Sequence, residues 1–233
     1  MRTVRSNKTD WILQSNHENL KVYLHQQSLA SIDTSESLET ITLAYEIALT
    51  YVAPSAFEES VTVLVVKDAD HMHQLIKKKS SGMAFPRQHL VVEVVGVIQT
   101  SHELFHLLSE NFWGKSAAWI EEGMAIHCDN QWWGHNLHDL AAYLKQQNRL
   151  YPLETLMDNT SFHSANSLYS YPQAGSFVKY LSENFGKDAM FTLWQTKNFQ
   201  ETFGNSASYV YHDWLRSLDS LSVVQIDYPI QDL

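Results

Sequence analysis

Short apolar runs alternate with helical patterns in the first half of the chain. Three runs have the length and the β-branched content of buried strands, at residues 19–25, 61–66 and 89–95. Asp33 opens a D-T-S-E capping pattern, and the apolar residues that follow at helical spacing predict a helix to about Val52. Asp68 is expected to cap a short helix that ends in the lysines at 77–79.

The second half of the chain is patterned almost entirely as helix. A helical segment over residues 97–114 joins the two halves, and Gly114 ends it. Further helices are predicted at 116–127, 137–147, 171–185, 187–196 and about 206–218. Strands followed by helices indicate an α+β fold with a small mixed sheet. We expect one domain over residues 1–233, with a strand-rich half to residue 114, a helical half from 115, and a cleft between them.

The segment that joins the halves contains the motif HELFH at residues 102–106. On a helix, positions four apart differ by about 40° around the axis and about 6 Å along it, so His102 and His106 point the same way. Imidazole nitrogen is a preferred zinc ligand. Glu103 is turned about 100° from His102, which leaves it placed to take a proton from water rather than to bind the ion.

The surroundings of the motif strengthen this reading. Chance placement gives such a motif in roughly 4% of chains of this composition, so the motif alone is a moderate signal. Most neighbouring residues are apolar, and burying two histidines and a glutamate among them is costly unless something satisfies them. A third ligand is expected from the carboxylates in WIEEGMA, where Glu121 and Glu122 precede Gly123. Gly123 lets another helix approach closely, but helical geometry alone does not choose between the two glutamates.

HELFH followed by WIEEGMA resembles the gluzincin metallopeptidases, most closely the aminopeptidase N-like branch and its small peptidase MA-like relatives. The resemblance implies a zincin-like fold with one zinc ion per chain, held by His102, His106 and Glu122, and Glu103 as the general base. The later stretch YPQAGSFVKYLSENFG resembles the helix of that family that opens with a tyrosine. By that resemblance Tyr171 donates a hydrogen bond to the oxyanion of the tetrahedral intermediate. The alternative donors are Tyr169, Tyr211 and His212, and the alternative role of Tyr171 itself is packing.

Two departures from the family pattern bear on the substrate. The spacing from His106 to Glu122 is shorter than in the large aminopeptidases, so the loop between the helix with HELFH and the helix with WIEEGMA must be tight. Aminopeptidases of this branch also carry a G-x-M-E-N strand that holds the free amine of the substrate. The nearest match is GMAF at residues 82–85, which has no glutamate. The sequence therefore favours an endopeptidase acting on a peptide or protein over an aminopeptidase.

Composition and charge exclude several other classes of protein. The formal net charge of −10 repels phosphate backbones, so no nucleic-acid partner is expected. No apolar run has the length of a membrane span or of the core of a signal peptide, which predicts a soluble, cytoplasmic protein, although a trimmed export signal would leave the same sequence. The single cysteine, Cys128, is expected to be a buried small side chain.

Some residues near the motif have more than one interpretation. His127, His135 and His138 are expected to be solvent-facing or helix-end residues rather than a second metal site. Trp132 and Trp133 lie in a predicted loop and either line a substrate cleft or pack against the helices. The alternative to an enzyme is a catalytically inactive zinc-binding or peptide-binding module on the same fold.

Overall fold

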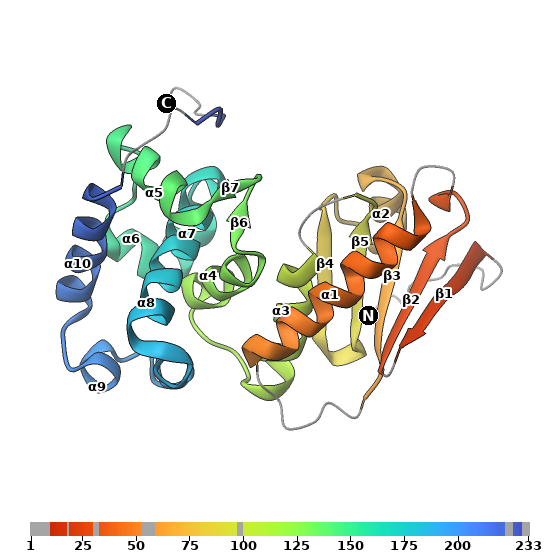
Figure 1. The fold of residues 1–233 in the computed structure, drawn as a ribbon, viewed down its shortest axis with the longest axis horizontal. Helices are drawn as coiled ribbons and strands as arrows, with labels where there is room; N and C mark the ends of the chain where they lie inside the picture. The colour runs from red at the N-terminus through yellow and green to blue at the C-terminus, as the bar shows by residue number, and fades with distance from the viewer. Residues whose placement is uncertain are drawn as a thin grey trace. The chain divides into compact units, whose positions relative to one another are not determined.

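The computed structural model describes residues 10–17, 19–29, 33–52, 59–96, 100–221 and 226–229. The chain divides into two compact units, Met1–Phe112 and Trp113–Leu233. The predicted α+β class is confirmed, because the first unit contains a five-stranded mixed sheet and the second is mainly helical (Figure 1). The division falls close to the predicted end of the strand-rich half at residue 114. A single catalytic domain over the whole chain stays a prediction.

The sheet of the first unit has three parallel central strands and an antiparallel strand at each edge. Its order is β1 (Trp11–His17), β2 (Leu20–His25), β3 (Val61–Val66), β5 (Leu90–Val94) and β4 (Gly82–Phe85). The predicted strands at 19–25, 61–66 and 89–95 are confirmed as β2, β3 and β5. The edge strands were not predicted, since β4 has four residues and β1 is half polar, and neither gives a clear periodic pattern.

Two predicted caps begin helices of the first unit. The Asp33 carboxylate accepts hydrogen bonds from the amides of Ser35 and Glu36 at 2.9 and 3.2 Å, at the start of α1 (Thr34–Val52). The Asp68 carboxylate accepts from the His71 amide at 2.8 Å, at the start of α2 (Ala69–Ile76). A short 3-10 turn, η3 (Pro86–Gln88), and α3 (Thr100–Phe112) complete the unit. The expected start of the joining helix, at 97–99, lies outside the described residues.

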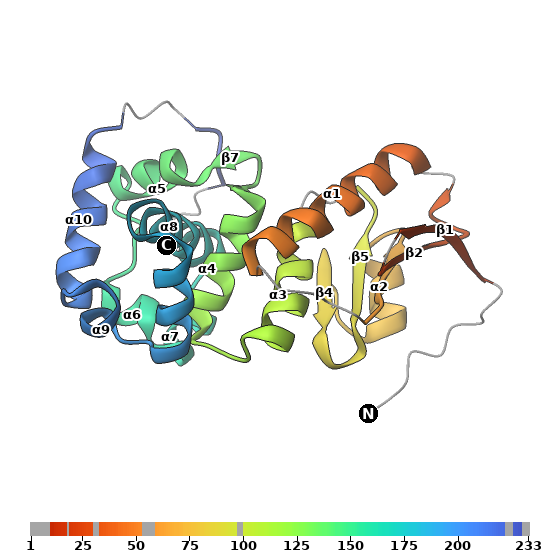
Figure 2. The same cartoon turned by 60° about the horizontal axis from the view of Figure 1, so that its bottom comes forward.

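Alternate residues of the central strands face opposite sides of the sheet, and α3 lies on one of these sides. Val66, Val92 and Met72 of α2 form a buried cluster on one face of the sheet. Since side chains alternate along a strand, Val91 and Glu93 face the opposite side, which α1 and α3 cover (Figures 1 and 2). Helix α3 is therefore a buried helix, as its apolar composition predicted.

The second unit is a group of helices around one long helix. Its elements are α4 (Ala118–Asp129), β6 (Gln131–Trp132), β7 (His135–Asn136), α5 (Leu137–Gln146), α6 (Leu153–Met157), α7 (Asn159–Ser164), α8 (Ser167–Thr196), α9 (Phe199–Phe203) and α10 (Ala207–Asp219). The predicted break between helices at residue 186 is confirmed, because Gly186 interrupts α8 with φ 80° and ψ 175°. Helix α8 begins earlier than predicted, at Ser167, because the Asn166 side chain caps it by accepting from the Leu168 amide at 3.0 Å.

Two glycines bring α4 and α8 into close contact. A Cβ added to Gly123 would lie 2.6 Å from Cγ2 of Val178 and 2.9 Å from the carbonyl oxygen of Ala174. A Cβ added to Gly175 would lie 2.5 Å from Cγ2 of Ile126. The expectation that Gly123 admits another helix is thus confirmed, and the contact fixes the position of α4 against α8 within this unit.

Several expectations from composition also have an outcome in the described residues. Cys128 is buried with 4% of its surface exposed, and this burial raises the pKa of its thiol. The lysines at 77–79 are exposed at the end of α2, as expected. Within the described ranges, no helix combines the length and apolar character needed to cross a membrane.

Candidate metal centre

Helix α3 brings the two motif histidines together. The Nε2 atoms of His102 and His106 are 3.1 Å apart, and the ring planes are 78° from each other with centroids 4.7 Å apart. His102 is 8% exposed and His106 is partly buried. Because the residues are one turn apart, the helix itself holds both nitrogens toward the same point.

Helix α4 separates the roles of the two adjacent glutamates. Oε1 of Glu121 accepts a hydrogen bond from the amide of Ser116 at 2.5 Å. Glu121 therefore reaches back over the helix start, where backbone amides lack helical acceptors and a negative charge is favourable. Glu122 is partly buried, and as the next residue it is turned about 100° from Glu121 around the helix axis. This arrangement supports Glu122 rather than Glu121 as the carboxylate ligand.

His102, His106 and Glu122 form a group that could hold a metal ion. One ligand atom from each side chain lies within 4.8 Å of the other two, and no other group of this kind occurs among the described residues. The residues that the sequence singled out as ligands are thus the ones that this geometry groups together.

The donor set fits zinc. With zinc–nitrogen distances of 2.0–2.1 Å and tetrahedral angles, two imidazole ligands lie about 3.3 Å apart. The observed separation of 3.1 Å between the two Nε2 atoms is close to that value. It is also the length of a hydrogen bond between a protonated and an unprotonated ring nitrogen, so metal binding would replace this contact.

Glu103 lies against the edge strand β4. A Cβ added to Gly82 would be 2.6 Å from Cγ and 2.9 Å from Oε1 of Glu103. No real Cβ atom approaches that closely, so the Glu103 side chain occupies space that any other residue at position 82 would fill. The glycine at the start of GMAF is therefore needed for the present position of the glutamate.

Tyr171 lies near the start of α8 between two aromatic rings. Its ring stacks on Phe162 at a centroid distance of 5.5 Å and lies 5.6 Å from Trp132, tilted by 39°. The alternatives are less accessible. Tyr169 is 2% exposed in an apolar cluster, and the Tyr211 hydroxyl donates to the carbonyl of Tyr151 at 3.0 Å. Sequence patterns did not predict the role of Phe162, which stands in a helix too short to show periodicity.

The other histidines have separate environments. Of the two expected positions for His127, the structure shows a helix-end residue, in the last turn of α4, and not a solvent-facing one. Burial lowers the pKa of His127 to about 4, with smaller contributions from Lys179 and His138. His135 contacts the carbonyl oxygen of Asp227 at 3.2 Å. His138 contacts the hydroxyl of Ser176 at 2.8 Å and the carboxylate of Glu183 at 3.2 Å. His135 and His138 therefore each contact different polar groups of the second unit.

The two tryptophans also differ from each other. Trp132 is 9% exposed, whereas Trp133 is 60% exposed at the tip of the β6–β7 hairpin, with φ 53°. Of the two earlier interpretations, packing therefore applies to Trp132. The Trp133 ring is exposed and lies edge-on to the Tyr228 ring, with 6.4 Å between the centroids.

No model of a known protein family matches the chain, and no curated protein matches it. The resemblance to gluzincins therefore rests on the three sequence blocks and stays a prediction.

The contact between Gly82 and Glu103 leads to a stability prediction. Replacing glycine with alanine in a strand normally stabilises a protein by about 0.5–1 kcal/mol. Gly82→Ala is instead expected to lower the free energy of unfolding by about 1–3 kcal/mol, because the new methyl group meets the Glu103 side chain. In a Glu103→Ala background the same change should be neutral or stabilising. Urea unfolding of the four proteins measures this coupling, and equal effects in both backgrounds would show that the contact is absent.

The two adjacent glutamates should respond differently to removal. Glu122→Ala is expected to weaken zinc binding by at least about 100-fold, more than the loss of a residue that only orients a ligand. Glu121→Ala should keep zinc affinity and lower stability by about 1 kcal/mol, because it removes the bond to the Ser116 amide. Competition with a chromophoric chelator and urea unfolding in EDTA separate the two effects. If Glu121→Ala were the variant that loses zinc, the third ligand would be Glu121 and not Glu122.

Proposed function

We propose that this chain is a zinc-dependent peptidase of the gluzincin type, with one zinc ion held by His102, His106 and Glu122. The observation that carries the proposal is the pair of Nε2 atoms 3.1 Å apart on one helix, grouped with a carboxylate of α4 within 4.8 Å. Three protein ligands of this kind leave one position of a tetrahedral ion open, which is the arrangement of catalytic rather than structural zinc.

The side chains around the group have complementary roles in this proposal. Zinc bound here would supply a Lewis acid that polarises the peptide carbonyl and makes water acidic enough to lose a proton near neutral pH. Glu103 follows the first ligand directly, and its carboxylate takes the proton of the attacking water and passes it to the leaving amine. Tyr171 donates a hydrogen bond to the oxygen on which negative charge develops.

The edge strand β4 supports a peptide as the substrate. It stands at one end of the sheet order, paired to β5 alone among the described strands, and its first residue contacts Glu103. An extended peptide that adds to such an edge gains main-chain hydrogen bonds along its length. Its backbone would then run beside the general base. Strand β4 carries no carboxylate to hold a free amine, which favours cleavage within a chain.

A catalytically inactive module is the second candidate. The observation in its favour is that the two Nε2 atoms lie at hydrogen-bond distance from each other, so these two nitrogens have a partner without a metal. Such a module would bind zinc or a peptide at the same residues without turnover. Activity, rather than metal content, distinguishes the two candidates.

The test replaces the general base without removing a ligand. Glu103→Gln is expected to retain one zinc per chain and the wild-type fold, and to lower kcat by about 10²–10⁴-fold, because the amide cannot accept the proton of water. The measurement is cleavage of a broad peptide library by zinc-loaded protein, followed by kinetics on a selected peptide. Zinc content is measured on the same samples by elemental analysis.

Glu110→Gln is the matched control, since it makes the same change two turns further along α3 and should leave kcat unchanged. A zinc-loaded wild type that cleaves no peptide would favour the inactive module. Cleavage by Glu103→Gln at the wild-type rate would exclude Glu103 as the base.

A further inference from the structure

Helix α8 contains a proline that leaves one carbonyl without its helical donor. Pro172 has no backbone N–H, so the carbonyl four residues earlier, that of Leu168, cannot receive the usual helical hydrogen bond. The Tyr228 hydroxyl donates to this oxygen at 2.6 Å. A side chain from the C-terminal segment 226–229 thus replaces the bond that the proline removes.

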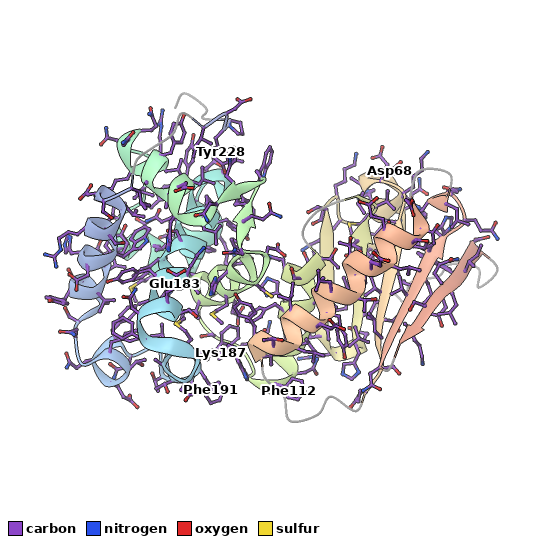
Figure 3. The ribbon with its side chains drawn as sticks, viewed as in Figure 1. Asp68, Phe112, Glu183, Lys187, Phe191 and Tyr228 are labelled. Carbon is purple, nitrogen blue, oxygen red and sulfur yellow. The ribbon has the colours of Figure 1, made fainter. Side chains whose placement is uncertain are left out.

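The same hydroxyl has a second partner. It accepts a hydrogen bond from Nε1 of Trp132 at 2.8 Å, so it uses both its donor and its acceptor capacity. Tyr228 is 6% exposed, and burial raises its pKa, which keeps the hydroxyl protonated and able to donate. Figure 3 labels this residue at the side of the unit that carries α5 and the β6–β7 hairpin.

Both partners of Tyr228 flank Tyr171. Leu168 lies one turn before Tyr171 on α8, and Trp132 supplies one of the two rings that enclose it, 5.6 Å between centroids. The other ring, Phe162, stacks on Tyr171 with 5.5 Å between the two centroids. One hydroxyl group therefore holds the helical turn below Tyr171 and the indole beside it.

We propose that the C-terminal segment 226–229 positions Tyr171 through the hydroxyl of Tyr228. The chemical consequence, a correctly directed donor to the oxyanion, rests on the proposed function. The geometric claim does not, because it concerns the orientation of the Tyr171 ring alone. Tyr228 is a positioning residue in this account and touches no substrate.

The geometric claim is tested by fluorine NMR. 3-Fluorotyrosine is placed at position 171 alone, and Tyr228→Phe is compared with wild type. The substitution keeps the ring of residue 228 and removes both hydrogen bonds, so the fluorine resonance of residue 171 is expected to shift or to split into two. An unchanged resonance would overturn the proposal.

Tyr211→Phe is the matched control. Tyr211 is 6% exposed, like Tyr228, and its hydroxyl donates to the carbonyl of Tyr151 at 3.0 Å and accepts from Nε2 of Gln173 at 2.9 Å. Its ring packs on Phe177 and Trp214. Tyr211→Phe should lower the thermal midpoint as Tyr228→Phe does, but leave the fluorine resonance of residue 171 in place. If both variants move the resonance alike, the effect is general loosening and the proposal is wrong.

Kinetics on a peptide cleaved by the wild type give the second readout. Tyr228→Phe is expected to lower kcat about tenfold with KM changed less than about twofold, because a misplaced donor weakens transition-state rather than ground-state binding. In a Tyr171→Phe background the same change should have no further effect on kcat. An equal loss in both backgrounds would overturn the proposal. If the wild type cleaves no peptide, the proposed function fails, and the fluorine resonance still decides whether Tyr228 positions Tyr171.

Discussion

The candidate site depends on two imidazole rings that lie one turn apart on a largely buried helix. Burying a polar ring nitrogen is costly unless it has a partner, and helix α3 gives the Nε2 atoms of His102 and His106 one by holding them 3.1 Å apart. At that separation the two Nε2 atoms can share a proton when no ion is bound. The separation also leaves the pair almost in the arrangement that zinc requires, so metal binding would need little movement of the helix.

Missing atoms at three positions determine local contacts near the candidate site. The missing side chain of Gly82 leaves the space that Glu103 occupies, and the missing side chain of Gly123 allows α8 to approach α4. The third such position is Pro172, whose missing N–H leaves a carbonyl for Tyr228. In each case an absent group leaves room or a hydrogen-bond acceptor for a residue from another element.

The sequence predicted the elements that depend on residues close together in the chain. Strands β2, β3 and β5, the caps Asp33 and Asp68, and the break at Gly186 all follow from apolar runs, capping residues and turn residues. The pairing of His102 with His106 follows from helical spacing. Helical geometry could not choose between Glu121 and Glu122, because that choice depends on Ser116, whose amide binds Glu121.

Other features depend on contacts between residues far apart in the chain, which local patterns do not contain. The burial of His127 was not predicted, because it depends on how α4 packs in the second unit rather than on neighbouring residues. The contact of Gly82 with Glu103 joins an edge strand to a helix, and the bond of Tyr228 to Leu168 spans 60 positions. Short elements such as β4 and α7 give too few residues for a periodic pattern.

X-ray absorption at the zinc edge of the zinc-loaded protein tests the central claim most directly. The account predicts a first shell with two imidazole nitrogens at about 2.0–2.1 Å, one carboxylate oxygen at about 2.0–2.2 Å and one further oxygen from solvent. The imidazole signal should fall to that of one ring in His106→Ala. A shell without two imidazoles, or one that is unchanged when His106 is replaced, would contradict the proposal that His102, His106 and Glu122 bind zinc.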